Sequence, residues 1–228
     1  MKKYDIFLFD ADGTLYDFNK AEAAAFKAMF DYCNFDYEEN KFKTYREINA
    51  QLWRSFEKGE ISSLELQITR FSRLFDTLNI QYDAKEFNDK YLTELGKGTY
   101  LLNGALDICK DIVSCGKKIY IITNGLLATQ IPRLKYSLIS EYISDAFISE
   151  AVGFQKPGIE FFEHVLLHIP KIGKDKILIV GDSLSADIAG GNAAGIDTCW
   201  FNETGVINHS DIVPTYEIRK LDELSEYI

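Results

Sequence analysis

The stretch that decides the fold is FDADGTLYD, residues 9–17, which directly follows an apolar run. It gathers three carboxylates, Asp10, Asp12 and Asp17, within nine residues. Like charges repel one another, and each carboxylate loses several kcal/mol of hydration when it is buried at the end of a strand. We therefore expect a cation or an electrophile to compensate this cluster.

Composition restricts the classes of partner. The chain has 228 residues, of which 46% are hydrophobic, and this is enough for a sizeable core. Its formal net charge of -10 argues against a nucleic-acid partner, because such binding relies on clustered Lys and Arg. A small anionic substrate is compatible with this charge, since a local cation can outweigh the overall field.

The sequence also indicates where the protein works. No apolar stretch is long enough to span a bilayer, so we expect no membrane partner. Asp5 and Asp10 interrupt the apolar run near the start, which argues against a signal peptide. The four cysteines are scattered and form no CxxC motif, as is typical of free thiols in a reducing compartment. We therefore expect a cytoplasmic protein.

Short apolar segments that end in polar or glycine-containing turns predict five β-strands. These are residues 4–10, 117–125, 145–150, 176–182 and 197–202. Their nearly continuous hydrophobicity is typical of strands that are covered on both faces, and hence of a parallel sheet. Helical patterns lie between most of them, including one that Gly195 is expected to end. The alternation predicts right-handed βαβ units and a doubly wound α/β fold.

The segment between residues 17 and 99 breaks this alternation. It contains no good strand, but it has four apolar stripes at helical spacing, and Ser62 and Glu65 form a predicted capping box at the start of the third. We expect a small antiparallel helical bundle. The predicted domains are therefore an α/β core, residues 1–16 and 100–228, and an inserted helical domain, residues 17–99.

Chemically active side chains gather where the predicted strands end. They come from four separate segments: Asp10 and Asp12, Thr123 and Asn124, Lys156, and Asp182. Each alone is weak evidence, because an Asp at a strand end is often a helix cap and a lone Lys is usually solvated. In an open parallel sheet, however, ligands bind outside the carboxyl ends of the strands. The four segments together therefore predict a site.

The residue types suit phosphoryl transfer. Carboxylate oxygens and water are the ligands that Mg²⁺ prefers, so Asp10 and Asp182 can share one ion. Lys156 and the Thr123 hydroxyl can hold phosphoryl oxygens. A carboxylate can attack phosphorus to give an aspartyl phosphate, and a second carboxylate two residues along, Asp12, can serve as acid and then as base.

Four motifs resemble those of the haloacid dehalogenase-like (HAD) hydrolase superfamily. They are FDADGT at 9–14, IITNG at 121–125, Lys156 within QKP, and VGDSLSAD at 180–187. The resemblance covers essentially the whole chain. It implies a Rossmann-like core and a helical cap of the first, early-inserted type.

The resemblance also implies roles for individual residues. Asp10 would be the nucleophile and Asp12 the general acid and base. The phosphoryl group would be bound by Thr123, Asn124 and Lys156. Mg²⁺ would be held by Asp10, by the backbone carbonyl of Asp12 and by Asp182, while Asp187 would act through water or through a neighbouring ligand.

Within the superfamily, the chain looks closest to a subgroup of pyrimidine 5′-nucleotidases. This resemblance rests on INAQLWRSFEKGEIS at 48–62 and TRF at 69–71 in the inserted segment, and on GIDTCWFN at 195–202 and PTYEIRKLDEL at 214–224. It implies a Mg²⁺-dependent nucleoside 5′-monophosphatase that prefers pyrimidines. The side chains that we expect to contact the base are Arg46, Asn49, Trp53 and Arg54.

Several other functions remain open. Phosphoglycolate, a sugar phosphate or another small phosphorylated metabolite is an alternative substrate, and a sugar phosphomutase shares the same motifs and cap type. A 2-haloacid dehalogenase is a further alternative, although it attacks carbon, needs no Mg²⁺ and lacks a counterpart of Asp12. An inactive binding module would not need all the motif residues. We expect a monomer or a weak homodimer.

Overall fold

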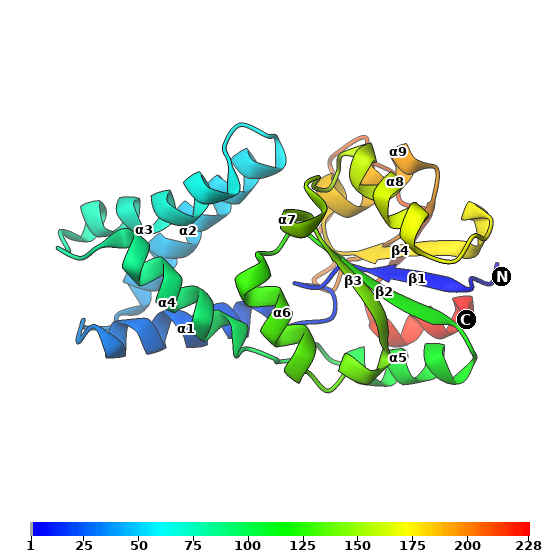
Figure 1. Cartoon of the computed structure of the whole chain (residues 1–228), viewed down its shortest axis with the longest axis horizontal. Coiled ribbons are helices and arrows are strands. Elements are labelled where there is room, and N and C mark those ends of the chain that lie inside the picture. Colours follow the sequence, from blue (N-terminus) through cyan, green and yellow to red (C-terminus); the bar gives the residue numbers. More distant parts are fainter. Residues whose placement is uncertain (1) are drawn as a thin grey trace.

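The computed structural model describes residues 2–228, and at its centre lies a six-stranded sheet (Figure 1). The strands are β1 (Ile6–Phe9), β2 (Lys118–Thr123), β3 (Ile143–Ile148), β4 (Ile177–Gly181), β5 (Asp197–Phe201) and β6 (Tyr216–Ile218). Their order across the sheet is β3-β2-β1-β4-β5-β6, and each neighbouring pair is parallel. The predicted doubly wound α/β fold is confirmed. The sequence analysis missed β6, a three-residue strand at the sheet edge.

Both faces of the sheet are covered by helices, as the continuous hydrophobicity of the strands predicts (Figure 1). Alternate residues of β1 point to opposite faces. Ile6 and Leu8 belong to one buried cluster, which includes residues of α8 (Ile159–His168) and α9 (Ala189–Ala194). Phe7 and Phe9 belong to another, which includes α5 (Ala105–Ser114) and the C-terminal 3-10 helix η4 (Leu221–Tyr227).

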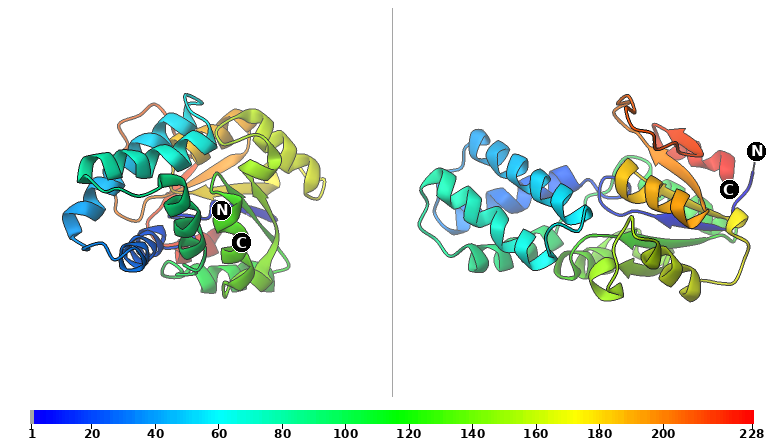
Figure 2. Two further views of the ribbon diagram at one scale, coloured as in Figure 1. Left: turned by 60° about the vertical axis from the view of Figure 1, so that its left-hand side comes forward. Right: turned by 90° about the horizontal axis from the view of Figure 1, so that it is seen from above.

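Four helices form a bundle beyond one end of the sheet, opposite the end where both termini lie (Figures 1 and 2). They are α1 (Phe18–Tyr32), α2 (Glu39–Glu57), α3 (Ser63–Leu78) and α4 (Ala84–Gly96). Asp17 caps α1 by accepting a hydrogen bond from the Lys20 amide, and the predicted Ser62–Glu65 capping box opens α3. The bundle has its own aromatic core, in which the rings of Tyr45 and Phe71 stack 5.3 Å apart.

The chain passes between sheet and bundle twice, and the two crossings lie side by side. Tyr16 forms an antiparallel bridge with Leu101, and the Asp17 amide donates to the Tyr100 carbonyl at 2.9 Å. Because the first crossing begins directly after β1, the bundle lies at the carboxyl ends of the strands. The division into domains at residues 17 and 99 stays a prediction.

One helix of the core was not predicted from the sequence. After β2 comes α6 (Leu127–Tyr136), which contains Pro132. It packs against the end of α4 so closely that a Cβ atom on Gly96 would lie 2.8 Å from the Pro132 ring. The remaining short elements are η1 (Ser140–Tyr142), α7 (Ser149–Val152), η2 (Lys174–Lys176) and the π-helical turn η3 (Leu184–Ile188). Across residues 2–228, no helix combines the length and apolarity that crossing a membrane requires.

Candidate active site

A cavity of about 390 Å³ lies where the sheet meets the bundle. From the core it is lined by Asp10, Asp12, Thr123, Asn124, Gly125, Lys156, Asp182, Ser183, Ala186 and Asp187. From the bundle it is lined by Phe18, Trp53 and Glu57. The four strand-end segments singled out in the sequence therefore meet around one space, as expected for the carboxyl edge of a parallel sheet.

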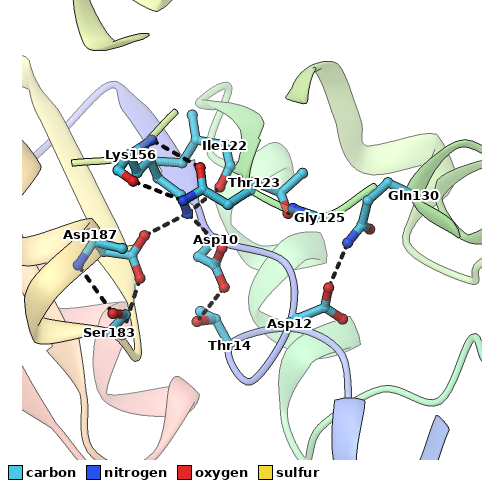
Figure 3. Close-up of polar contacts among 12 residues, drawn as sticks. Asp10, Asp12, Thr14, Ile122, Thr123, Gly125, Gln130, Lys156, Ser183 and Asp187 are labelled. Atoms are coloured by element: carbon cyan, nitrogen blue, oxygen red, sulfur yellow. Dashed lines mark hydrogen bonds and ion pairs between the residues drawn. The ribbon is translucent and has the colours of Figure 1, made fainter. Parts of the chain in front are cut away.

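The centre of the site is the buried ammonium group of Lys156 (Figure 3). Its Nζ atom lies 2.7 Å from Asp10 Oδ1, 2.6 Å from Asp187 Oδ1 and 2.8 Å from the Ile122 carbonyl. Burial on its own would lower the pKa of Lys156, but the two carboxylates outweigh it and hold that pKa above its usual value. Lys156 is therefore a fixed positive charge beside Asp10.

Three carboxylates lie close together at this site, and two of them, Asp10 and Asp187, pair with the single ammonium group. Asp10, Asp182 and Asp187 each offer an oxygen atom, and these atoms all lie within 4.8 Å of one another. Burial raises the pKa of Asp10 well above its usual range. Burial likewise raises the pKa of Asp182 to about 7, although this side chain is open to the cavity. Such an excess of carboxylate oxygens fits a divalent cation such as Mg²⁺.

Two glycines allow these carboxylates to approach the backbone. A Cβ atom on Gly13, which has a φ of +83°, would lie 2.4 Å from Asp182 Oδ2. A Cβ atom on Gly181 would lie 2.2 Å from Asp187 Oδ2. The other oxygen of Asp187 is bonded to Lys156, so the structure gives Asp187 a direct partner in the site.

The residues of the second motif have structural partners. Thr123 Oγ1 accepts a hydrogen bond from the Gly125 amide at 3.0 Å. The Asn124 side chain binds the backbone of Lys156 in both directions, donating to its carbonyl at 2.8 Å and accepting from its amide at 2.9 Å. Asn124, which was predicted to bind phosphate, thus holds the Lys156 segment in place.

Asp12 points away from Asp10 and towards α6 (Figure 3). Its carboxylate accepts a hydrogen bond from Gln130 Nε2 at 2.5 Å and forms an ion pair with Arg133. The sequence analysis missed both partners because it predicted no helix after the second motif. The available signal was the spacing of Gln130 and Arg133, since residues three apart share one face of a helix.

Glu57 is a further residue that the sequence analysis missed. It ends α2, and its Oε2 atom accepts a hydrogen bond from Ser185 Oγ in the core at 3.0 Å. Close by, Gln155 Nε2 donates to the Phe56 carbonyl at 2.6 Å. A wide cavity of about 710 Å³ adjoins these contacts, between the α2–α3 turn and residues 149–160. On this side, therefore, two hydrogen bonds and a cavity lie between sheet and bundle.

The predicted base-contacting residues lie in different places. Trp53 lines the 390 Å³ cavity, whereas Arg46 and Asn49 line a neighbouring cavity of about 620 Å³ between α1 and α2, which shares Phe18 and Trp53 with the first. Arg54 is exposed and lines neither of these two cavities.

Comparison with known proteins identifies the family. Residues 7–201 match the family model described as Haloacid dehalogenase-like hydrolase. The chain belongs to this family. It is therefore a hydrolase of the HAD superfamily, which confirms the resemblance found in the motifs.

Three relatives match almost the whole chain. HAD-hydrolase YfnB of Bacillus subtilis is 42% identical, covering 98% of this chain and 95% of its own. Pyrimidine 5′-nucleotidase PynA of Streptococcus pneumoniae is 37% identical, covering 97% and 93%. Pyrimidine 5′-nucleotidase YjjG of Escherichia coli is 32% identical, covering 99% and 98%. A crystal structure of YfnB, described as bound to magnesium and as revealing interdomain movement, superposes with a TM-score of 0.93 at 41% identity, covering 99% and 98%.

The neighbouring cavity contains a buried acid, Glu22. Its carboxylate accepts a hydrogen bond from Asn49 Nδ2 at 2.9 Å and lies 3.6 Å from Arg46 Nε. Burial raises the pKa of Glu22 from 4.5 to about 7, with Arg46, Asn49 and Arg70 opposing the shift and Asp12 adding to it. The folded protein therefore favours the neutral form of Glu22.

This raised pKa predicts a pH dependence of stability. As pH rises from 4.5 to 7, the unfolded chain loses the Glu22 proton while the folded chain retains it, so Glu22 on its own contributes a loss of about 3 kcal/mol of stability over this window. We expect Glu22→Gln to remove that loss. The free energy of unfolding, measured with urea at pH 4.5 and pH 8, checks this. Between these two pH values, the free energy of the variant minus that of the wild type should rise by about 3 kcal/mol.

The matched control is Glu47→Gln, which removes the charge of an exposed glutamate on α2. An equal difference between wild type and Glu22→Gln at both pH values would contradict the raised pKa.

Proposed function

We propose that the protein is a Mg²⁺-dependent phosphomonoester hydrolase that forms an aspartyl phosphate on Asp10 and prefers pyrimidine nucleoside 5′-monophosphates. One observation carries the proposal. Asp10 is paired with a buried lysine on one wall of the 390 Å³ cavity, while the carboxylate of Asp12 lines the same cavity with separate partners. A nucleophile and an acid/base are two different roles, and these two environments support that division.

The acidic side of the cavity supports a metal site. We propose that Asp10, the backbone carbonyl of Asp12, and Asp182 hold Mg²⁺, with Asp187 supporting the site from its bond to Lys156. The bound ion would neutralise charge on the phosphoryl group and lower the pKa of the carboxylates that hold it. Lys156 adds positive charge beside the nucleophile, and Thr123 lines the same cavity.

The proposed reaction has two steps. First, a carboxylate oxygen of Asp10 bonds to phosphorus as the bond from phosphorus to the leaving oxygen breaks, and protonated Asp12 gives its proton to that oxygen. An alcohol leaves. Second, the Asp12 carboxylate takes a proton from a water molecule whose oxygen bonds to phosphorus, and the bond between Asp10 and phosphorus breaks. Phosphate leaves, and both aspartates return to their starting protonation states.

Asp12 favours phosphate hydrolysis over dehalogenation. A halide leaves as an anion and needs no proton, whereas an alcohol does. The names of PynA and YjjG support a nucleotide substrate, because both relatives are pyrimidine 5′-nucleotidases. A phosphomutase differs only in what accepts the phosphoryl group from Asp10, and it stays an alternative.

We propose that the helical bundle, residues 17–99, is a cap that selects the leaving group. Phe18 and Trp53 present aromatic surface to the cavity, on which a base can stack. Arg46 and Asn49 supply polar groups in the adjoining cavity. Acting on small metabolites, the protein would work in the cytoplasm as a monomer or weak homodimer without nucleic-acid or membrane partners.

The nucleophile is tested by Asp10→Asn. An amide is a poor nucleophile and a poor Mg²⁺ ligand, so we expect phosphatase activity to fall by more than about a thousandfold while the fold is kept. Release of phosphate from 4-nitrophenyl phosphate, together with circular dichroism, measures both. The control is Asp17→Asn, which changes the third carboxylate of the same stretch, whose observed role is to cap α1. Substantial activity in Asp10→Asn would refute the mechanism.

The metal ligands are tested by titrating Mg²⁺ calorimetrically into two variants. Asp182→Ala removes a proposed ligand, so we expect its Mg²⁺ affinity to fall by at least about tenfold. Asp12→Asn keeps the proposed carbonyl ligand, so it should bind Mg²⁺ nearly as the wild type does. Equal losses of affinity in the two variants would contradict the proposed division of roles.

Substrate preference is tested with a panel of phosphomonoesters. We expect kcat/KM for UMP, dUMP and dTMP to exceed that for AMP, glucose phosphates and phosphoglycolate by about tenfold or more, a difference of about 1.4 kcal/mol or more. Trp53→Ala should reduce this preference, whereas Tyr32→Ala, an exposed aromatic residue of the bundle, should not. A preference for sugar phosphates or phosphoglycolate would overturn the nucleotidase assignment and leave the phosphatase mechanism intact.

A further inference from the structure

Arg133 lies at the junction of α6, the first strand end and both chain crossings. Its side chain is fully buried, and its guanidinium forms an ion pair with Asp12. The guanidinium also lies over the ring of Tyr16, 5.4 Å from its centroid, and Nη2 donates to the Leu95 carbonyl at 3.5 Å. Tyr16 belongs to the outgoing crossing, and Leu95 lies in the last turn of α4 before the chain returns.

The burial of this cation makes the pair with Asp12 specific. Within residues 2–228, no carboxylate other than Asp12 lies within salt-bridge distance of Arg133. A buried guanidinium is unfavourable unless a carboxylate and hydrogen bonds compensate it. Tyr16 contacts the face of the guanidinium and the Leu95 carbonyl binds Nη2, whereas Asp12 binds Nη1. The three contacts therefore restrain different parts of the group. The orientation of Asp12 is therefore tied to a rigid group.

Gln130 restrains the second oxygen of the same carboxylate. Its Nε2 atom lies 2.5 Å from Asp12 Oδ2, whereas Arg133 contacts Oδ1 (Figure 3 shows the Gln130 contact). Gln130 is itself fully buried and packs over Gly125, where a Cβ atom would lie 2.1 Å from the Gln130 amide nitrogen. One face of α6 thus supplies a separate donor to each oxygen of Asp12.

We propose that Gln130 and Arg133 are positioning residues that fix the orientation of the Asp12 carboxylate at the cavity wall and thereby control proton transfer from Asp12 to the leaving group. This inference rests on the proposed function, because it takes Asp12 as the acid and base. Asp10 is held by other partners, Lys156 and Thr14. Loss of the α6 donors therefore disturbs the acid and leaves the nucleophile in place.

The identity of the leaving group separates these two effects. A phenolate needs a proton as it departs, whereas 2,4-dinitrophenolate is stable enough to leave without one. The parameter kcat/KM reports the steps up to formation of the aspartyl phosphate, because release of the phenol makes that step irreversible. A defect confined to the acid therefore lowers kcat/KM for phenyl phosphate and spares that for 2,4-dinitrophenyl phosphate.

The test compares Arg133→Gln and Gln130→Met with the wild type on these two substrates. We expect kcat/KM for phenyl phosphate to fall by about 10- to 100-fold in each variant, as for a misplaced catalytic group, and kcat/KM for 2,4-dinitrophenyl phosphate to change little. Lys135→Gln, which removes an exposed cation from α6, is the control and should leave both values unchanged. Arg133→Lys, which keeps the charge but loses the second donor nitrogen, replaces Arg133→Gln if that variant does not fold.

Asp12→Asn distinguishes failure of this inference from failure of the proposed function. Asp12→Asn should lower kcat/KM for phenyl phosphate and spare that for 2,4-dinitrophenyl phosphate. Adding Arg133→Gln to Asp12→Asn should not increase the difference between the two substrates any further. If Asp12→Asn affects both substrates equally, Asp12 is not the acid and the proposed function is wrong. The positioning role is wrong if Asp12→Asn lowers kcat/KM for phenyl phosphate alone, but the α6 variants lower kcat/KM equally for both substrates. It is also wrong if the α6 variants raise kcat/KM for phenyl phosphate.

Discussion

The architecture of the site depends on one buried cation. The Lys156 ammonium lies between Asp10, which follows β1, and Asp187, which belongs to the turn after β4, and it also binds the β2 carbonyl of Ile122. One group thus joins the ends of three neighbouring strands. Removing one partner of a buried ion pair typically costs about 3–5 kcal/mol because the other charge is left buried and uncompensated, so the three strand ends depend on one another. Asn124 extends this arrangement by holding the Lys156 backbone.

Because Lys156 gathers carboxylates on one side only, the two walls of the 390 Å³ cavity differ in charge. On one wall, Asp10, Asp182 and Asp187 crowd around a single lysine, and the resulting excess of negative charge suits a divalent cation. On the other wall, Asp12 faces its own cation and amide from α6. Two carboxylates only two residues apart in the chain therefore have separate environments. This separation suits the proposed roles of Asp10 as a nucleophile and Asp12 as a proton donor.

Much of this arrangement was predictable from the sequence, for identifiable reasons. The central strands are continuously apolar because both faces of the sheet are covered, and the motif residues meet because parallel strands end at one edge. By contrast, α6 contains Pro132 and three buried polar residues, Thr129, Gln130 and Arg133, so it lacks the apolar stripe that marks a helix. The partners of a polar group also depend on tertiary contacts, which is why the sequence did not reveal that Asn124 holds the Lys156 backbone, while its predicted role at the phosphate stays a prediction. Likewise, the sequence pattern could not distinguish Trp53, which lines the cavity, from its exposed neighbour Arg54.

The unequal packing between bundle and sheet has a consequence for substrate exchange. At the α4–α6 contact the backbone of Gly96 approaches Pro132 too closely for any side chain, and the paired crossings lie on the same side. Across the cavity mouth, the hydrogen bonds between bundle and core among residues 2–228 are Ser185–Glu57 and Gln155–Phe56, beside a cavity of about 710 Å³. Two such bonds contribute about 1–3 kcal/mol together, which corresponds to an equilibrium factor of about 5–150. The mouth is therefore the less tightly packed side of the junction, and we expect a small molecule to reach the cavity from this side without any part of the chain unfolding.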